Sequence, residues 1–249
     1  MKFGEFLGRF VYTRKCPSCN ELIPYELSHE AFCNECRAKW DKEKVRECDV
    51  CGRVMCECSC MTRTLAQSGA LCHKKIVNYS SKVAVVHNTL IFIKKNNNTR
   101  VSRFLAVQLS SVLSADEDIS EMISSDCVVC YVPRSRSAVL KYGHDQSQLL
   151  AQALSEELGC TFIPALRRSK RSSRAQKKLS ADKRAKNVRN MFETEPELSA
   201  EIKGKRVVLV DDIVTTGASM GACARVLIRA GAVAVICASV ASTKSTGRH

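Results

Sequence analysis

The sequence lacks any long apolar run. Its first fifteen residues contain no apolar segment of the length that a secretory signal peptide needs, and no small-residue cleavage site. The longest later apolar stretch, residues 232–240, is well short of a membrane span. These absences predict a cytoplasmic protein with no membrane insertion, where thiols stay reduced. Paired cysteines in such a protein indicate metal binding more often than disulfides.

Acidic and aromatic residues are scarce in one stretch of the chain, from Arg167 to Arg189. This stretch holds eleven Lys or Arg and a single acid, Asp182, so most of the formal net charge of +14 lies within it. Such a segment is typical of proteins that bind phosphate-rich ligands or nucleic acid, although a solvated, flexible loop has the same composition. Residues 167–191 contain no Phe, Tyr or Trp. This absence excludes an aromatic ladder for stacking bases, so single-stranded DNA bound here would be held by charge.

Cysteine, by contrast, is abundant, and ten of the fifteen cysteines precede residue 73. The first four form the pattern C-x2-C-x13-C-x2-C. Each C-x2-C pair places two thiolates on one side of a tight turn, and two such turns complete a tetrahedral site with no open position. We therefore expect a structural Zn2+ that stabilises a segment with little apolar core. Its ligands would be Cys16, Cys19, Cys33 and Cys36.

A second group of cysteines follows the first. Cys48 and Cys51 repeat the C-x2-C turn, and Cys56, Cys58 and Cys60 come shortly afterwards. The C-x-C-x-C arrangement is not the usual closing turn, so the spacing leaves the closing pair open. We expect a second zinc held by Cys48, Cys51 and two of the remaining three.

The stretch from Lys205 to Ser219, KRVVLVDDIVTTGAS, is the most informative in the chain. Residues 207–210 are an uninterrupted branched apolar run, which predicts a strand buried on both faces of a parallel sheet. Two carboxylates follow where we expect that strand to end, and then a turn of small residues. Ser219 would cap a helix that runs to about Ala230. The stretch thus predicts a ligand site at the carboxyl end of a strand and the N-terminus of a helix.

This arrangement suits a ribose phosphate. Carboxylates accept hydrogen bonds from the vicinal ribose hydroxyls, while amides and hydroxyls of the Thr-Thr-Gly loop hold a 5-phosphate. Residues 207–219 resemble, at every position, the phosphoribosyl pyrophosphate (PRPP) motif of type I phosphoribosyltransferases. The resemblance implies PRPP as ligand and Mg2+ as the metal that accompanies its diphosphate. The predicted PRPP-binding residues are Asp211, Asp212, Thr215, Thr216, Gly217, Ala218 and Ser219.

Strand and helix signals alternate from Lys74 onward, which predicts an α/β doubly wound parallel sheet. With the cysteine-rich segment, this divides the chain into a double zinc ribbon over residues 1–75 and a phosphoribosyltransferase-like domain over 76–249. Cys127 and Cys130 fall inside an expected strand, where residues three apart face opposite sides, so we interpret them as core residues. We expect helices at 100–113 (capped by Thr99) and 145–157, strands at 127–132, 161–166 and 233–240, and a surface connection at 115–125.

The order of these pieces resembles the ComF family, in which a double zinc ribbon precedes a phosphoribosyltransferase-like domain. The resemblance covers nearly the whole chain, and His144-Asp145 stands where similar proteins usually carry Phe-Asn. It implies an association with DNA uptake in natural transformation, with single-stranded DNA and the DNA-uptake helicase machinery as partners. Besides the PRPP motif, the matching stretches are CPSC and CNEC with Trp40, Val132-Pro133, Gly143-His144-Asp145-Gln146, Gln176, Leu179, Arg184, and Asn187-Val188-Arg189 leading to Phe192.

Two classes of function are compatible with these residues. One is an enzyme that transfers phosphoribose to or from an unknown base or amine; Arg134, Ser135 and Arg136, after an apolar strand, are then candidates for the pyrophosphate. The other is a non-catalytic component of the competence machinery that binds single-stranded DNA or nucleotides. No residue stands out in the sequence as a general base, so catalytic residues stay unknown.

Overall fold

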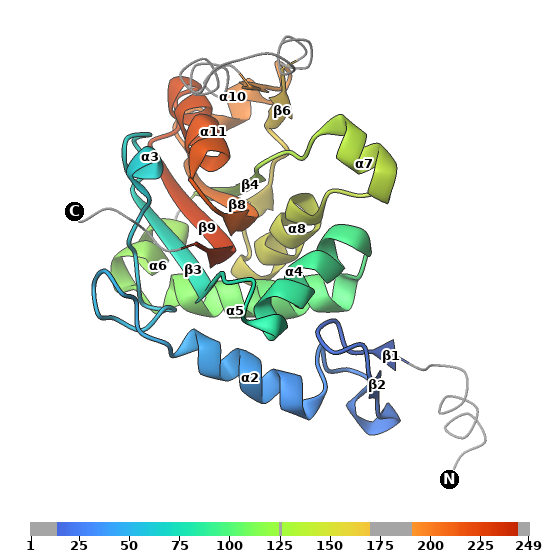
Figure 1. Cartoon of the computed structure of the whole chain (residues 1–249). Helices are drawn as coiled ribbons and strands as arrows, with labels where there is room; N and C mark the ends of the chain where they lie inside the picture. Colours follow the sequence, from blue (N-terminus) through green and yellow to red (C-terminus); the bar gives the residue numbers. More distant parts are fainter. Residues whose placement is uncertain (1–13, 125, 170–190, 244–249) are drawn as a thin grey trace, which may run out of the picture.

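A five-stranded parallel sheet organises the molecule. The structure is a computed structural model that describes residues 14–124, 126–169 and 191–243 (Figure 1). The strand order is β3-β9-β8-β4-β5, and every neighbouring pair is parallel. The predicted α/β fold class is therefore confirmed. The strands are β3 (Cys72–Asn78), β4 (Cys127–Tyr131), β5 (Thr161–Phe162), β8 (Arg206–Val214) and β9 (Ala234–Ser242).

Strand β8 is central because its apolar residues are buried on both faces. Val208 and Val210 belong to the core on one face, and Val207 and Leu209 to the core on the other. All four are fully buried. The uninterrupted apolar run is thus the expected consequence of helices covering both sides of a parallel sheet.

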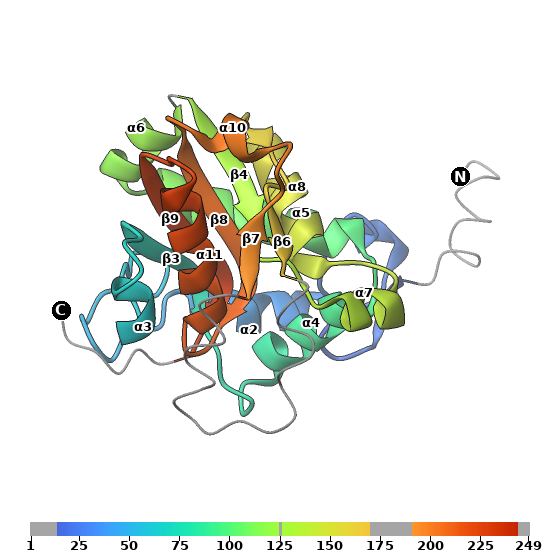
Figure 2. The same cartoon turned by 90° about the horizontal axis from the view of Figure 1, so that it is seen from above.

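Helices α5 and α8 cover one face of the sheet, and α11 covers the other (Figures 1 and 2). Helix α4 contributes to the same core as α5 and α8, and a small antiparallel pair, β6–β7, lies against α11. The remaining bounds are α4 (Ala84–Lys95), α5 (Thr99–Ser114), α6 (Glu117–Ser124), α7 (Arg136–Tyr142), α8 (Gln146–Leu158), β6 (Leu166–Arg168), β7 (Phe192–Thr194), α10 (Ser199–Ile202) and α11 (Ala218–Arg229).

The cysteine-rich segment packs against this α/β layer. Its helix α2 contacts β3 and α4. Phe32 and Trp40 stack on each other and meet Phe104 of α5 edge-on, so the first cysteine group shares the larger core. The elements are β1 (Arg14–Lys15), β2 (Leu22–Ile23), the 3-10 turn η1 (Tyr25–Leu27), α2 (Asn34–Lys44) and α3 (Arg63–Ala66). The proposed boundary after residue 75 stays a prediction, and β3 of the sheet begins at Cys72.

Several local expectations need correction. The stretch 115–125, expected as a surface connection, contains helix α6, whose Ile119 and Ile123 are buried one turn apart. Helix α5 is capped by the Asn98 side chain, which accepts from the Val101 amide, so Thr99 is the first helical residue. The expected strand 161–166 is split between β5 and the start of β6.

Helix α11 also begins earlier than expected. Gly217, and not Ser219, is its N-cap residue, with a φ of 75°. That backbone conformation is open to glycine at little cost. Ser219 is therefore inside the first turn.

Candidate functional site

The acidic pair lies within β8 and not after it. The strand continues to Val214, beyond the point where we expected it to end, because residues 211–214 still pair with β9. Asp211 and Asp212 point to alternate sides of the strand. Asp211 accepts a hydrogen bond from the Ser147 hydroxyl of α8 at 2.9 Å. The Oδ2 atom of Asp212 lies 3.2 Å from Nζ of Lys94 on α4.

The two carboxyls are held in different electrostatic surroundings. Burial, followed by the neighbouring charge of Asp212, raises the pKa of Asp211 well above its ordinary value, against the stabilising hydrogen bond from Ser147. Asp212 is 3 % exposed, and its Oδ2 receives no hydrogen bond of normal geometry from the described residues. A buried carboxylate oxygen with unused acceptor capacity suits a hydroxyl donor or a metal ion.

Lys94 is a site residue that the sequence analysis missed. It comes from the last turn of α4, more than a hundred residues before the acidic pair, and its ammonium is half-exposed. The sequence shows two lysines at the end of an apolar run, which gives no sign of what they face. Only the packing of α4 beside the carboxyl end of the sheet brings this cation to Asp212.

The Thr215–Gly217 loop connects β8 to α11 and contacts the start of α3. The Thr62 hydroxyl donates to the Thr216 carbonyl at 3.0 Å. A Cβ at Gly217 would come within 2.3 Å of the Thr62 hydroxyl oxygen, so the close approach itself demands glycine. Thr62 is a second supporting residue that the sequence analysis missed. The hydroxyl-bearing side of the loop, at Thr215 and Thr216, remains exposed.

The candidate pyrophosphate residues follow β4. The backbone amide of Arg134 donates to Asp145, and its guanidinium donates to the Lys94 carbonyl and lies over the ring of Tyr142. Ser135 caps α7 through its hydroxyl. Arg136 is exposed at the start of that helix. The structure therefore gives Arg134 and Ser135 local partners, and their contact with a pyrophosphate stays a prediction.

His144 and Asp145, the departure from the family pattern, fix this loop to its neighbours. One ring nitrogen of His144 lies 2.9 Å from the Ile93 carbonyl of α4, and the other lies 2.9 Å from the Tyr142 carbonyl. Asp145 caps α8 and also accepts from the Arg134 amide. The pair thus joins the loop after β4 to the end of α4, next to Lys94.

The basic segment is described only at its start. Arg167 pairs with Glu193 and Glu195 across β6–β7, and Arg168 donates to the Pro133 carbonyl at 3.0 Å. Residues 170–190, with most of the positive charge and the family matches from Gln176 to Arg189, lie outside the described residues.

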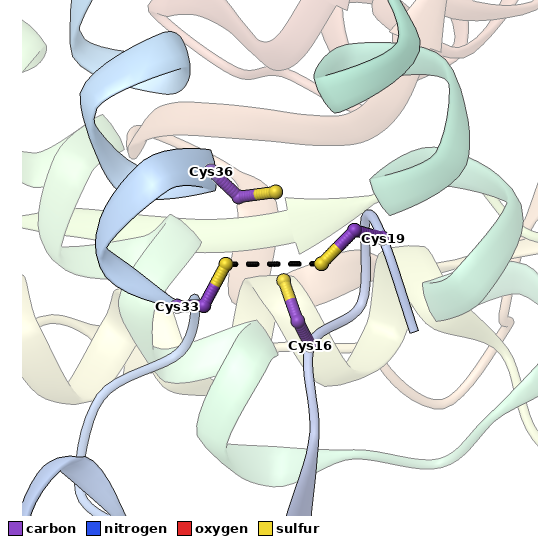
Figure 3. A group of neighbouring side chains, drawn as sticks. All are labelled: Cys16, Cys19, Cys33 and Cys36. Carbon is purple, nitrogen blue, oxygen red and sulfur yellow. Dashed lines mark hydrogen bonds between the residues drawn. The ribbon is translucent and has the colours of Figure 1, made fainter. Parts of the chain in front are cut away.

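The first cysteine group comes together as its spacing predicts. The sulfurs of Cys16, Cys19, Cys33 and Cys36 converge from two turns, with all four within 4.8 Å of one another (Figure 3). Four thiolates around one point match a closed tetrahedral zinc site. Asn88 of α4 donates to the carbonyl of Ser18, inside the first turn, at 2.8 Å. The first group is thereby tied to the helix that carries Lys94.

The second group settles the choice that the sequence left open. Cys58 and Cys60 join Cys48 and Cys51 within 4.8 Å, and Cys56 is outside the group. Burial raises the pKa of the Cys48 thiol, but hydrogen bonds, led by those from the Val50 and Cys51 amides, outweigh it and lower the pKa to about 7. The donor set therefore fits a second zinc ion.

Cys127 and Cys130 are core residues, as predicted. They are 7 % and 0 % exposed, belong to the cores on opposite faces of the sheet, and join no metal-binding group among the described residues. No helix in the described part of the chain is long and apolar enough to span a membrane.

Comparison with known proteins agrees with this geometry. Residues 138–249 match the phosphoribosyl transferase domain, so the acidic pair and its loop belong to a domain of that class. The chain is 27% identical over 215 residues to the DNA utilization protein YhgH of Salmonella typhimurium, which covers 86% of this chain and 91% of that protein. It is 24% identical over 223 residues to competence protein F of Haemophilus influenzae, with 87% and 92% covered. The predicted resemblance to the ComF family is therefore confirmed.

The chain also matches a solved structure. It is the glutamine PRPP amidotransferase from B. subtilis, with 23% identity and a TM-score of 0.35. The match covers 55% of this chain and 26% of that one, so the chain spans about a quarter of its length.

Proposed function

We propose that this protein binds PRPP, or a related ribose phosphate, together with Mg2+ at Asp211, Asp212 and the loop from Thr215 to Ser219. The observation that carries the proposal is the acidic pair beside the Thr-Thr-Gly loop, whose two threonines are exposed, at the carboxyl end of a central parallel strand within a phosphoribosyl transferase domain. The names of the relatives, DNA utilization protein and competence protein F, support a role in DNA uptake during competence.

The chemistry of such a ligand fits the residues present. The vicinal ribose hydroxyls would donate to the carboxylates, and the amides at the start of α11 would face the 5-phosphate. Mg2+ prefers oxygen ligands and would be held on the diphosphate near the acidic pair. Lys94 adds a cation next to Asp212, which strengthens attraction for an anionic ligand.

We also propose that both cysteine groups bind Zn2+ and that neither ion is catalytic. Each group supplies four sulfurs, which leaves no coordination position for a substrate. The ions would then act on function only by holding α4 and α3 against the ligand site.

Whether phosphoribose is transferred is a separate question from binding. Transfer requires breaking the bond between the anomeric carbon and the pyrophosphate oxygen through an oxocarbenium-like state. A phosphoribosyltransferase of the competence pathway would release pyrophosphate when given its acceptor. A protein that uses the same site as a nucleotide or single-strand sensor would bind PRPP without releasing pyrophosphate.

Thermal unfolding with millimolar PRPP and Mg2+ tests the binding proposal. Ligand that binds only the folded state raises the melting temperature by mass action. Asp212→Asn should abolish most of the shift, and Lys94→Ala should weaken PRPP binding about tenfold, as expected for a lost charge-assisted interaction. Lys95→Ala is the matched control, because Lys95 is the exposed neighbour on the same helix. If PRPP and Mg2+ left the melting temperature of the wild type unchanged, the binding proposal would be contradicted.

A further inference from the structure

Helix α4 crosses the carboxyl edge of the sheet from β3 towards β4 (Figure 1). In its first half, His87 is hydrogen-bonded to Tyr79, the residue that follows β3. Two turns further on, Lys94 lies 3.2 Å from Asp212 of β8. The carbonyls of the last turn of α4 then contact the loop after β4. The helix thus places three groups in a row: the Tyr79–His87 pair, the acidic pair and the candidate pyrophosphate residues.

Hydrogen bonds between the strand ends place Tyr79 level with the acidic strand. Its amide donates to the Ser242 carbonyl of β9, and Ser242 is paired in register with Val214 at the end of β8. The next residue, Thr243, donates through its hydroxyl to the Thr215 carbonyl. Two strand spacings separate β3 from β8, so the backbone of Tyr79 lies about 10 Å from the acidic strand. A ribose on the acidic pair and a group joined to it together span this distance.

Tyr79 and His87 form a pair that leaves one ring nitrogen unused. The Tyr79 hydroxyl lies 3.0 Å from Nδ1 of His87, and both side chains are half-buried. The Nε2 atom of His87 makes no hydrogen bond with any residue in the described part of the chain. When Nδ1 carries the proton and donates to the hydroxyl oxygen of Tyr79, Nε2 keeps a lone pair that can accept a proton.

This pair lies on the side of the sugar from which an acceptor must approach. The candidate pyrophosphate residues follow β4, and Tyr79 follows β3, which is on the other side of β8 in the sheet. In an inverting transfer, the incoming group occupies the face of the sugar ring opposite to the leaving group. Pyrophosphate at the β4 side therefore leaves the β3 side for the acceptor. His144 is on the pyrophosphate side, and carbonyl oxygens contact both of its ring nitrogens.

We propose that His87 is the general base of phosphoribosyl transfer and that Tyr79 is its positioning residue. This deepens the proposed function and rests on it, because the step needs PRPP at the acidic pair. The lone pair of the acceptor nitrogen forms the new bond to the anomeric carbon. The bond from that carbon to the pyrophosphate oxygen breaks, and its electron pair leaves with pyrophosphate. The proton of the acceptor nitrogen passes to Nε2 of His87, while Nδ1–H keeps donating to Tyr79.

The test measures pyrophosphate release from PRPP and Mg2+, with ammonium chloride, adenine and uracil as separate acceptor probes. His87→Ala should lower kcat about 100-fold or more and leave KM for PRPP unchanged, because a general base acts only in the transition state. Added imidazole should restore the rate at least several-fold, because it supplies the missing base from solution. Tyr79→Phe should lower kcat by up to about tenfold, again without a change in KM, because one hydrogen bond to the base is lost.

The controls separate the loss of a base from a change in structure. His87→Asn keeps a side-chain amide near the position of Nδ1 but removes the base, so it should lose as much activity as His87→Ala. His29→Ala and Tyr25→Phe remove the same groups at exposed positions in the cysteine-rich segment and should leave kcat unchanged. The melting shift with PRPP and Mg2+ shows that each variant is folded and binds PRPP. If His87→Ala lacks that shift, His87→Asn takes its place.

Three results would overturn the proposal. The first is unchanged pyrophosphate release in the folded His87 variants. The second is a loss that imidazole does not restore, which would make the role of His87 structural. The third is a wild type that binds PRPP but releases no pyrophosphate with any of the probes, because no proton would then pass to His87. A wild type that does not bind PRPP would contradict the proposed function itself, which the melting shift shows separately.

Discussion

The two cysteine groups have the same ligands but are built into the molecule differently. The first group shares the larger core, where Cys16 and Cys36 lie with Phe32, Trp40 and the apolar face of α5. The second has a small core of its own, made of its buried cysteines and Met55. The first is therefore continuous with the α/β fold, whereas the second is attached to it by a few specific contacts.

Those contacts are polar, and they lead to the candidate functional site. Lys75 of β3 is 3 % exposed and donates to the carbonyls of Cys58 and Cys60. A zinc ion with four thiolates carries a net charge of about −2, so this buried cation also offsets the charge of the second group. Thr62, two residues after Cys60, reaches the Thr216 carbonyl. The first group therefore supports the fold, and the second supports the Thr215–Gly217 loop.

The largest expected effect comes from breaking the first group. Cys36→Ser should lower the bound zinc from two ions to one and cost on the order of several kcal/mol of unfolding free energy, because the site and the shared core are lost together. Elemental analysis and denaturant unfolding measure both. Cys58→Ser should lose one zinc but destabilise the α/β sheet far less. Equal destabilisation by the two variants would contradict the comparison.

Asp211→Asn tests the ligand site without touching either cysteine group. It should weaken PRPP binding by about 10- to 100-fold, because a charged acceptor for a hydroxyl or a metal is lost. It should also raise the stability of the ligand-free protein at neutral pH. Burial raises the pKa of this carboxyl in the folded state, so wild-type stability falls as pH rises from the unfolded-state pKa through the folded-state pKa.

Melting temperatures between pH 5 and 8 measure this effect. The Asn variant should show a smaller decline than the wild type over this range, since it has no carboxyl to ionise at this position. A variant that is less stable than the wild type at pH 8 would mean that the charged form of Asp211 stabilises the fold.

Thr62→Val tests the link between the second group and the Thr215–Gly217 loop. The change keeps the shape of the side chain but removes the donor to Thr216 and the cap of α3, at a cost of about 1–2 kcal/mol. PRPP affinity should fall several-fold while both zinc ions stay bound. Thr64→Val, on the exposed side of the same short helix, is the control and should leave PRPP affinity unchanged.

Asn88→Ala should have the smallest effect, and on the first group alone. It removes the hydrogen bond to the Ser18 carbonyl, worth about 1 kcal/mol. Zinc release to a chelator should become faster for one ion and stay the same for the other. If both ions were released faster, or neither, Asn88 would not be the contact that ties the first group to α4.

The elements that the sequence predicted correctly are those that local residue patterns specify. The apolar run at 207–210, the C-x2-C spacing and the helix ending at Gly159 each identify their element, because neighbours in the chain specify them. Helix α6 was missed because the stretch 115–125 is mostly polar. The spacing of Ile119 and Ile123, one helical turn apart, was the signal that could have identified it.

The contacts that the sequence did not predict depend on tertiary packing. No pattern near Lys94 shows that it faces Asp212, and nothing near Thr62 indicates the Thr216 carbonyl. The choice of Cys58 and Cys60 over Cys56 likewise follows from how the chain turns back toward Lys75. Arg14 and Arg100 are far apart in the sequence, and both donate to the Ser28 carbonyl. Contacts of this kind require the fold before they can be recognised.

The most direct test of the ribose-phosphate site is a calorimetric titration of PRPP with Mg2+ into the wild-type protein, with Asp212→Asn measured alongside. The account predicts one bound PRPP per chain in the wild type, and affinity about 10- to 100-fold lower in the variant. Saturable binding that is the same in both proteins would place the ligand away from the acidic pair. No binding to the wild type at millimolar PRPP would contradict the account outright.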